Sequence, residues 1–574
     1  MRYEYDLIIR GGTIVDGTGG ELFDADLAVR DGNIARIGQI SGAGEREIDA
    51  RDRLVMPGFV DIHTHYDAQA TWANHLTPSS SNGVTTVLMG NCGVGFAPVR
   101  PHDHERLISL MEGVEDIPEV VLSEGLSWAW ESFPEYLHAL STRHFDVDVA
   151  AQVPHAPLRV YVMGERGANR EPATAKDIAA MAALAREGVQ AGAFGFSTSR
   201  LLQHRTAHGE PVPSYGAAAE ELQAIALAVS EAGRHCWIQL VADYAEAQAS
   251  EFELYRLLTK SSGLPLTLSL LQRESHPDEW RQLLDRIELA NEQGLRITGQ
   301  TRGRPTSTLM GFELSFNPFD ECVSWQQIAD LSFDDRLPVL QDPEFRARII
   351  SESPTTSRYA VRRRHWERIF RLGNPPNYEP TLSESVACQA EQRGMTPEAV
   401  AYEWMMEQGG RGILYRPTTN YAAGSMDAVY DMLRHPHTLI GLGDGGAHVG
   451  VMCDATDMTH ALTHWTRDRS RGGRLEIADV VRRLTSANAA ALGLSDRGIL
   501  RQGLRADINV VNYDELKLHA PAIHYDLPAG GKRLLQRVDG YDATLVAGQA
   551  VWTDGDATGA LPGRLLRSRS RAGK

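Results

Sequence analysis

The stretch MPGFVDIHTHYDAQ, Met56 to Gln69, closes an apolar run with two histidines one residue apart. In an extended strand, residues i and i+2 point to the same face, so His63 and His65 project together. Two imidazoles on one face can share one metal ion. Apolar strands that end in functional side chains are typical of a (β/α)8 barrel, whose active site lies at the carboxyl ends of its strands. The stretch therefore predicts a barrel strand that ends in a metal site.

The chain downstream of this stretch alternates short β-branched runs with helical segments. The run GVTTVLMG (83–90) precedes HERLISLMEGV (104–114), and TLIGLGDGGAH (438–448) follows SMDAVYDMLR (425–434). Such alternation indicates a parallel sheet with crossover helices. Because no glycine-rich dinucleotide turn is present, the pattern favours a closed TIM-type (β/α)8 barrel over residues 56–498. This α/β segment exceeds the roughly 250 residues of a bare barrel, so we expect an insertion.

The expected insertion lies around residues 305–381, a region rich in Arg, Trp and Phe and poor in strand pattern. We interpret it as a helical lid over the barrel mouth. Its aromatic residues either line an apolar pocket or form the insertion's own core, and the second alternative is favoured.

Both chain ends have a β pattern with Gly and Asp-Gly turns. Residues 1–55 and 499–574 are therefore predicted to pair into one small β-sandwich, which makes everything between them an inserted domain. The tail RLLRSRSRAGK (564–574) is expected to be frayed and basic.

Composition narrows the classes of partner. The 574 residues are 42% hydrophobic and carry a formal net charge of −18, which argues against a nucleic-acid surface. The five cysteines form no CxxC pair, so neither a disulfide framework nor a zinc knuckle is indicated. The start of the chain has no long apolar segment, and no later run approaches ~18 apolar residues. We expect a cytoplasmic protein that acts on a small molecule away from membranes, with homo-oligomerisation left open.

Several long motifs carry a family resemblance. VMPGFVDIHTH (55–65), GVTTVLMGNCGVGFAPVRP (83–101) and LSWAWESFPEYLHAL (126–140) resemble the amidohydrolase superfamily, in its N-acyl-D-amino-acid deacylase (D-aminoacylase) branch. The resemblance covers nearly the full chain. It implies a metal-dependent hydrolase of an amide carbon-nitrogen bond that deacylates an N-acyl amino acid, with the D configuration as one option.

The resemblance also implies roles for single residues. In this branch a cysteine thiolate takes the bridging position that a carbamylated lysine has in many relatives, and Cys92 matches it. None of the five lysines (176, 260, 517, 532 and 574) follows a barrel strand. Asp444 matches the aspartate that contacts the metal and acts as general base; without the match it would be read as a turn former. His448, four residues on, either faces the same mouth as a substrate-binding residue or is an ordinary loop histidine.

The sequence departs from the family pattern at two expected metal ligands. The histidines of the fifth and sixth strands should fall near Gln239 or Leu240 and near Leu270, and leucine cannot bind a metal. Three interpretations follow. The favoured one is a single Zn2+, rather than two, held by His63, His65, Cys92 and Asp444. In the second, loop histidines replace the missing ligands; the candidates are His204, His208, His235 and His276.

The third interpretation is that metal or hydrolysis has been lost. The barrel would then act on a different amide, a cyclic amide or an ester, or would bind a ligand without catalysis. A carboxylate on the substrate would need an Arg, Tyr or Ser partner, and sequence does not separate the arginine candidates, which include Arg166, Arg200, Arg302 and Arg304.

Overall fold

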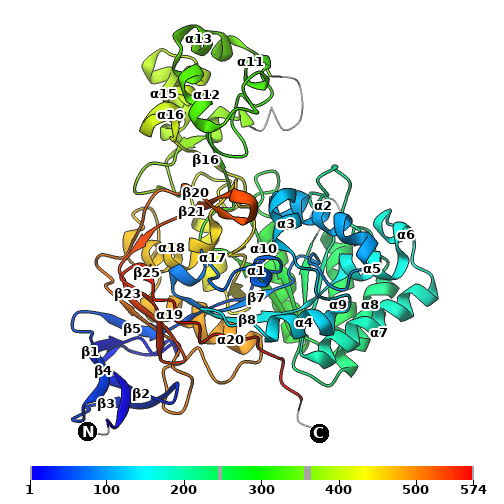
Figure 1. Ribbon diagram of the computed structural model, residues 1–574, viewed down its shortest axis with the longest axis vertical. Coiled ribbons are helices and arrows are strands. Elements are labelled where there is room, and N and C mark those ends of the chain that lie inside the picture. The colour runs from blue at the N-terminus through cyan, green and yellow to red at the C-terminus, as the bar shows by residue number, and fades with distance from the viewer. Residues whose placement is uncertain (1–2, 243–247, 355–362, 572–574) are drawn as a thin grey trace.

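The computed structural model describes residues 3–242, 248–354 and 363–571. Figure 1 shows three parts: a terminal β domain, a large central α/β part, and a helical group that projects from it. Within the described ranges, no helix combines the length and apolar character needed to cross a bilayer.

Parallel strands form the centre of the molecule. One sheet contains β6 (Phe59–Asp61), β7 (Val84–Met89) and β8 (Asp148–Ala151). The other contains β9 (Val153–Pro154), β10 (Gly195–Ser199), β11 (Trp237–Val241), β12 (Leu266–Ser269), β13 (Ile297–Thr301) and β17 (Thr438–Ile440). Only Gln152 separates β8 from β9, so the two sheets continue into each other.

The first and last strands of this series meet at their carboxyl ends. The Asp444 amide donates to the carbonyl of His63 at 3.0 Å, and the His65 amide donates to the carbonyl of Gly445 at 2.7 Å. Because all the strands are parallel, their carboxyl ends share one rim, and the segments that follow β6 and β17 lie side by side on it.

Helices cover the outside of these strands. They are α7 (Ala175–Ala191), α8 (Ala219–Glu231), α9 (Gln248–Ser262), α10 (Glu279–Glu292) and α17 (Asp427–Arg434). In α10, the buried residues Trp280, Leu283, Leu284 and Ile287 recur at helical spacing and form one apolar stripe. This periodicity explains why the segment forms a helix and which of its faces packs on the sheet.

The two chain ends share one sheet of nine strands. Its order is β25-β24-β23-β18-β5-β1-β2-β3, with β4 on β1. The N-terminal strands are β1 (Tyr5–Ile14), β2 (Phe23–Arg30), β3 (Asn33–Gly38), β4 (Gly44–Asp49) and β5 (Leu54–Pro57), and the C-terminal ones are β18 (Ile508–Val511), β23 (Tyr541–Val546), β24 (Gln549–Thr553) and β25 (Asp556–Ala557). The termini join where β5 pairs antiparallel with β18. The expected pairing of the two ends is therefore present, within one hydrogen-bonded sheet around a shared apolar core.

The helical group contains α11 (Val323–Gln326), α12 (Phe333–Gln341), α13 (Pro343–Ser351), α15 (Val386–Arg393) and α16 (Pro397–Gly410). It stands on a stalk of the antiparallel strands β14 (Ser307–Met310) and β16 (Leu414–Pro417) (Figure 1). The group continues past the expected boundary at residue 381: the chain comes back to the stalk at β15 (Phe370–Arg371), which pairs with β16, and then forms α15 and α16, whose buried residues share the core of the group. Its aromatic residues, including Phe312, Trp325 and Tyr402, form a core of their own.

The C-terminal tail differs from the expectation of fraying. Gly563 and Leu566 donate backbone hydrogen bonds to Phe145 and Val149, and Arg571 donates to Gly233. The described part of the tail therefore runs along the central α/β part as a hydrogen-bonded strap. Backbone pairing of this kind leaves no signal in side-chain composition, so sequence reasoning missed it.

Candidate metal centre

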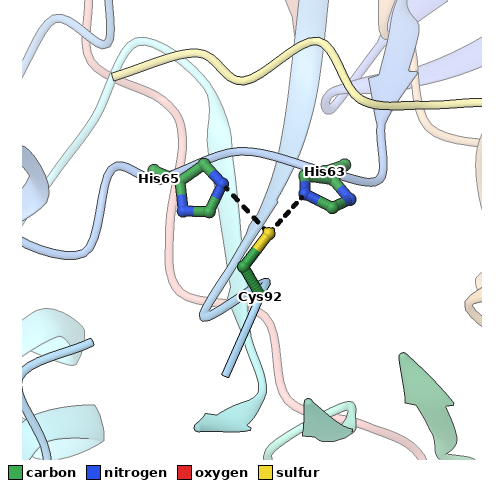
Figure 2. Close-up of side chains that lie close together, drawn as sticks. All are labelled: His63, His65 and Cys92. Atoms are coloured by element: carbon green, nitrogen blue, oxygen red, sulfur yellow. Dashed lines mark hydrogen bonds between the residues drawn. The ribbon is translucent and has the colours of Figure 1, made fainter. Parts of the chain in front are cut away.

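His63, His65 and Cys92 converge at the rim. The His63 Nε2 atom lies 3.3 Å from Cys92 Sγ, and His65 Nε2 lies 3.8 Å from the same sulfur. All three side chains are buried, and Figure 2 shows both rings turned toward the thiol. His63 and His65 follow β6 on either side of Thr64, which forms a bridge with Gly445, and both imidazoles reach the same sulfur, as the spacing predicted.

A tight turn delivers Cys92 to this place. Gly90, Cys92 and Gly93 all have positive φ angles, of 82°, 55° and 69°. A Cβ atom on Gly93 would lie 2.8 Å from the Cα atom of Thr198, so only glycine fits there. The Cys92 amide donates to Gln239 Oε1 at 3.0 Å, which fixes the turn against the fifth strand. Burial, and secondly the nearby Glu115 carboxyl, raises the pKa of the Cys92 thiol well above its usual value.

Asp444 supplies a fourth donor. Its Oδ1 atom lies 3.5 Å from His63 Nε2 and 3.7 Å from His65 Nε2. Its Oδ2 atom lies 3.6 Å from an Nη1 atom of the buried Arg302. Asp444 has a φ of 47°, and its backbone amide is tied to His63. The backbone hydrogen bond therefore fixes the turn that carries Asp444, and the carboxylate faces the Nε2 atoms of both imidazoles.

A contact with Gln300 fixes the orientation of the His63 ring. Its Nδ1 atom lies 2.9 Å from Gln300 Oε1, and an amide oxygen can only accept a hydrogen bond. The proton is thus on Nδ1, which leaves the Nε2 lone pair directed toward Cys92. Burial lowers the pKa of His63, and burial followed by the charge of His63 lowers the pKa of His65 well below its usual value. Neutral imidazoles are the form that binds metals.

These donors fit a zinc ion. Two nitrogens, one sulfur and one carboxylate oxygen suit tetrahedral Zn2+, whose bonds to nitrogen and sulfur are about 2.0 and 2.3 Å long. In a tetrahedron those bond lengths place the donors roughly 3.5 Å apart. The four separations that join the two imidazoles to Cys92 and to Asp444, 3.3 to 3.8 Å, bracket that value. His63, His65 and Cys92 form one cluster of ligand atoms, and Asp444 approaches it from the side of the two imidazoles.

The fifth and sixth strands contribute no such donor in the described structure. Gln239 holds the Cys92 turn, and Leu240 and Leu270 are fully buried. Val241 lines the cavity from the fifth strand, and Ser269 and Leu271 line it from the sixth. The prediction that the family's ligand histidines would fall near Gln239 or Leu240 and near Leu270 stays a prediction; the residues that line the cavity from these two strands include no histidine.

The metal donors form the floor of a cavity of about 410 Å³. Its apolar wall consists of Val114, Leu201, Val241, Leu271, Leu442 and Met452. Its polar lining includes Gln203, Arg273, Thr306, Thr418, Thr419 and His448. Thr306 and Thr418 line the cavity where the insertion leaves the central part. Both lie next to the stalk strands and outside the helices of the helical group. A lid role for the helices therefore stays a prediction.

The structure divides the remaining histidine and arginine candidates into those that line the cavity and those that do not. His204 lines the cavity and contacts Ser199 Oγ at 2.9 Å, and burial lowers its pKa to about 3. The other three loop histidines are not among the lining residues. Of the four arginine candidates named from the sequence, only Arg302 lines the cavity. Arg304 is not among the lining residues and pairs with Asp454.

Three residues of the site escaped sequence reasoning. Gln300 and Glu115 contact His63 and His65, and Arg273 lines the cavity. Glu115 ends helix α2 (His104–Glu115) and is 1% exposed. Its only signal in the sequence was its place in GVEDIP (113–118), just beyond an amphipathic helix.

Comparison with known proteins agrees with this geometry. The family model described as "Amidohydrolase family" matches residues 46–552, and the chain belongs to that family. The N-acyl-D-aspartate deacylase of Alcaligenes xylosoxydans xylosoxydans is 27% identical over 567 residues, which cover 98% of this chain and 95% of that protein. The D-aminoacylase of the same organism is 39% identical over 195 residues, 34% of this chain and 37% of that one.

Two solved structures of related enzymes have a similar fold. A D-aminoacylase studied for its binuclear metal centre superposes with a TM-score of 0.65 at 25% identity, over 98% of this chain and all of that one. The N-acyl-D-glutamate deacylase of Bordetella bronchiseptica, solved with zinc and a phosphonate inhibitor, has the same fold, with a TM-score of 0.65 at 24% identity over 98% of this chain and 99% of that one. Within the amidohydrolase family, the chain falls in the D-aminoacylase branch. The resemblance drawn from the motifs is thereby confirmed.

Proposed function

We propose that this protein is a metal-dependent hydrolase that cleaves the amide bond of an N-acyl amino acid, with the D enantiomer as the preferred substrate. The observation that carries the proposal is the convergence of His63, His65, Cys92 and Asp444 on the floor of one cavity. The activities named for its relatives, an N-acyl-D-aspartate deacylase and a D-aminoacylase, support the bond type and the configuration.

The scaffold that we propose is a closed (β/α)8 barrel. Two observations support closure: β8 continues into β9 across a single residue, and backbone hydrogen bonds join the segments after β6 and β17. In such a barrel the chemistry lies at the carboxyl ends of the strands, which is where the four donors lie.

We propose one zinc ion per chain, held by His63, His65, Cys92 and Asp444. When bound, zinc supplies positive charge that polarises an acyl oxygen and acidifies water. One ion is favoured over two because the fifth and sixth strands offer Val241 and Leu271 to the cavity.

The protein's own groups then move the protons. Asp444 is the one donor whose side chain has appreciable exposure, 13%, so it is positioned to accept a proton from water and to pass it to the leaving amine. Arg302 lies against Asp444 and Asp454, and its contact with Asp444 orients that carboxylate.

The cavity lining suggests how the substrate lies. The apolar wall suits an apolar acyl or amino-acid side chain, which it would shield from water. Arg273 and His448, on the same cavity, are the candidates for the substrate carboxylate. Arg273, which pairs with Glu279, is preferred over Arg302, which contacts two carboxylates.

Two measurements on the purified protein test the proposal. Elemental analysis should give about one zinc per chain, and a panel of N-acyl amino acids of both configurations should show hydrolysis that a chelator stops and zinc restores. Full activity without metal would refute the mechanism, and two ions per chain would show that further ligands exist. Hydrolysis of cyclic amides or esters alone would assign a different substrate, and a metal-free protein without hydrolase activity would indicate a ligand-binding barrel.

A further inference from the structure

Glu115 is a buried carboxylate that faces the metal centre from outside the four proposed ligands. Its Oε1 atom lies 3.3 Å from His65 Nδ1, and its Oε2 atom lies 3.6 Å from His448 Nε2. A carboxylate that is 1% exposed carries a large desolvation cost unless something nearby uses its charge or its hydrogen-bonding capacity.

The two proposed histidine ligands each have an oxygen beside Nδ1, but they differ in one respect: Nδ1 of His63 is hydrogen-bonded, whereas Nδ1 of His65 has an oxygen within ion-pair distance and no hydrogen-bond partner in the described structure. His63 has Nδ1 at 2.9 Å from Gln300 Oε1 and Nε2 at 3.3 Å from Cys92 Sγ. His65 has Nδ1 at 3.3 Å from Glu115 Oε1 and Nε2 at 3.8 Å from the same sulfur. Each ring thus faces an acceptor oxygen on one side and the other metal donors on the opposite side. An acceptor at Nδ1 fixes the proton there and leaves the Nε2 lone pair for a metal.

The position of Glu115 is itself fixed from several directions. Its carbonyl accepts the amide of His448, and Asp116, which follows it in the left-handed region at φ 52°, accepts the amide of Gly450 at 3.1 Å. The end of helix α2 is therefore clamped to the loop that follows Asp444. A carboxylate anchored through its backbone can hold a partner ring in one orientation.

We propose that Glu115 is a positioning residue that fixes the tautomer and the orientation of His65 for metal binding. The inference rests on the proposed metal centre, because it assigns a role toward that ion. Orienting partners of metal-bound histidines typically contribute 10- to 100-fold to metal affinity.

Zinc affinity, measured by competition with a chromophoric chelator, tests this role without an activity assay. Glu115→Leu should weaken zinc binding about 10- to 100-fold. Glu115→Gln, which keeps an oxygen for the Nδ1 proton, should lose less than about tenfold. Glu115→Leu is expected to fold, because it removes a buried carboxylate that has no Arg or Lys among its ion-pair partners in the described structure. Thermal unfolding of the metal-free variants checks this directly.

Two comparisons sharpen the result. Gln300→Leu removes the equivalent acceptor from His63 and should weaken zinc binding to a similar extent. In a His65→Ala background, Glu115→Leu should cause no further loss, because its partner is already gone. Equal zinc affinity in wild type and Glu115→Leu, or an additive loss in the double variant, would overturn the positioning role and leave the metal centre intact. A wild-type protein that binds no zinc would overturn both.

Discussion

Replacing Asp444 by asparagine separates its proposed chemistry from its structural contacts. The substitution keeps the shape of the side chain and its amide oxygen within reach of His63 and His65, but removes the negative charge and the ability to accept a proton. General-base catalysis is typically worth 10²- to 10⁴-fold. We therefore expect kcat to fall by about 10²- to 10⁴-fold, equivalent to about 3–5 kcal/mol in the activation free energy.

The fold should tolerate this change. Arg302 keeps its contact of 2.5 Å with Asp454, so no buried cation loses its last carboxylate. The free energy of unfolding should stay within about 1 kcal/mol of wild type. Zinc should still bind through His63, His65 and Cys92, with reduced affinity.

The assay is steady-state hydrolysis at saturating zinc, with the metal content of each preparation measured in parallel. Asp320→Asn is the matched control, because Asp320 is 16% exposed and pairs with Arg363, as Asp444 is 13% exposed and contacts Arg302. The control should keep full activity. Zinc-loaded Asp444→Asn with more than a tenth of wild-type kcat would refute the assignment of Asp444 as the base.

Two further predictions concern the framework of the site. Although burial opposes it, hydrogen bonds from His155 and Arg159 lower the pKa of Glu221 to about 2, so its stabilisation is complete above its ordinary value of 4.5 and is lost as the pH falls toward 2. Glu221→Gln should lower the free energy of unfolding by about 1–3 kcal/mol at pH 7 and by less than half of that at pH 3, and an equal deficit at both pH values would contradict this. Gly93→Ala should cost about 2 kcal/mol or more and weaken zinc binding, because its Cβ would meet Thr198 at a positive φ; unchanged stability and affinity would show that the turn adapts.

Features set by local periodicity were readable from the sequence. The spacing of His63 and His65 predicted that the two imidazoles would lie together, and the alternating β and α segments anticipated the parallel strands and their helices. The pairing of the chain ends followed from their matching β pattern. Cys92 and Asp444 needed the family motifs, because nothing local shows that two turns more than 350 residues apart meet at one rim.

Contacts that depend on tertiary packing could not be predicted from the sequence. Gln300 lies 237 residues from His63 and Gln239 lies 147 residues from Cys92, and amides of this kind are common anywhere in a chain. The predicted insertion ended too early, at residue 381, because α15 and α16 have the same sequence pattern as helices that cover a barrel.

The donors for the proposed ion all come from one side of the cavity. Three of its donors, His63, His65 and Cys92, come from the first two strands of the series, and Asp444 comes from the turn beside them. The opposite wall presents Val241 and Leu271, which can shield a substrate but cannot hold a metal. With no ligand from that side, the ion depends on the fixed directions of the two imidazoles. Those directions are set by Gln300 and Glu115, so this centre should respond to changes in its orienting residues almost as strongly as to changes in its ligands.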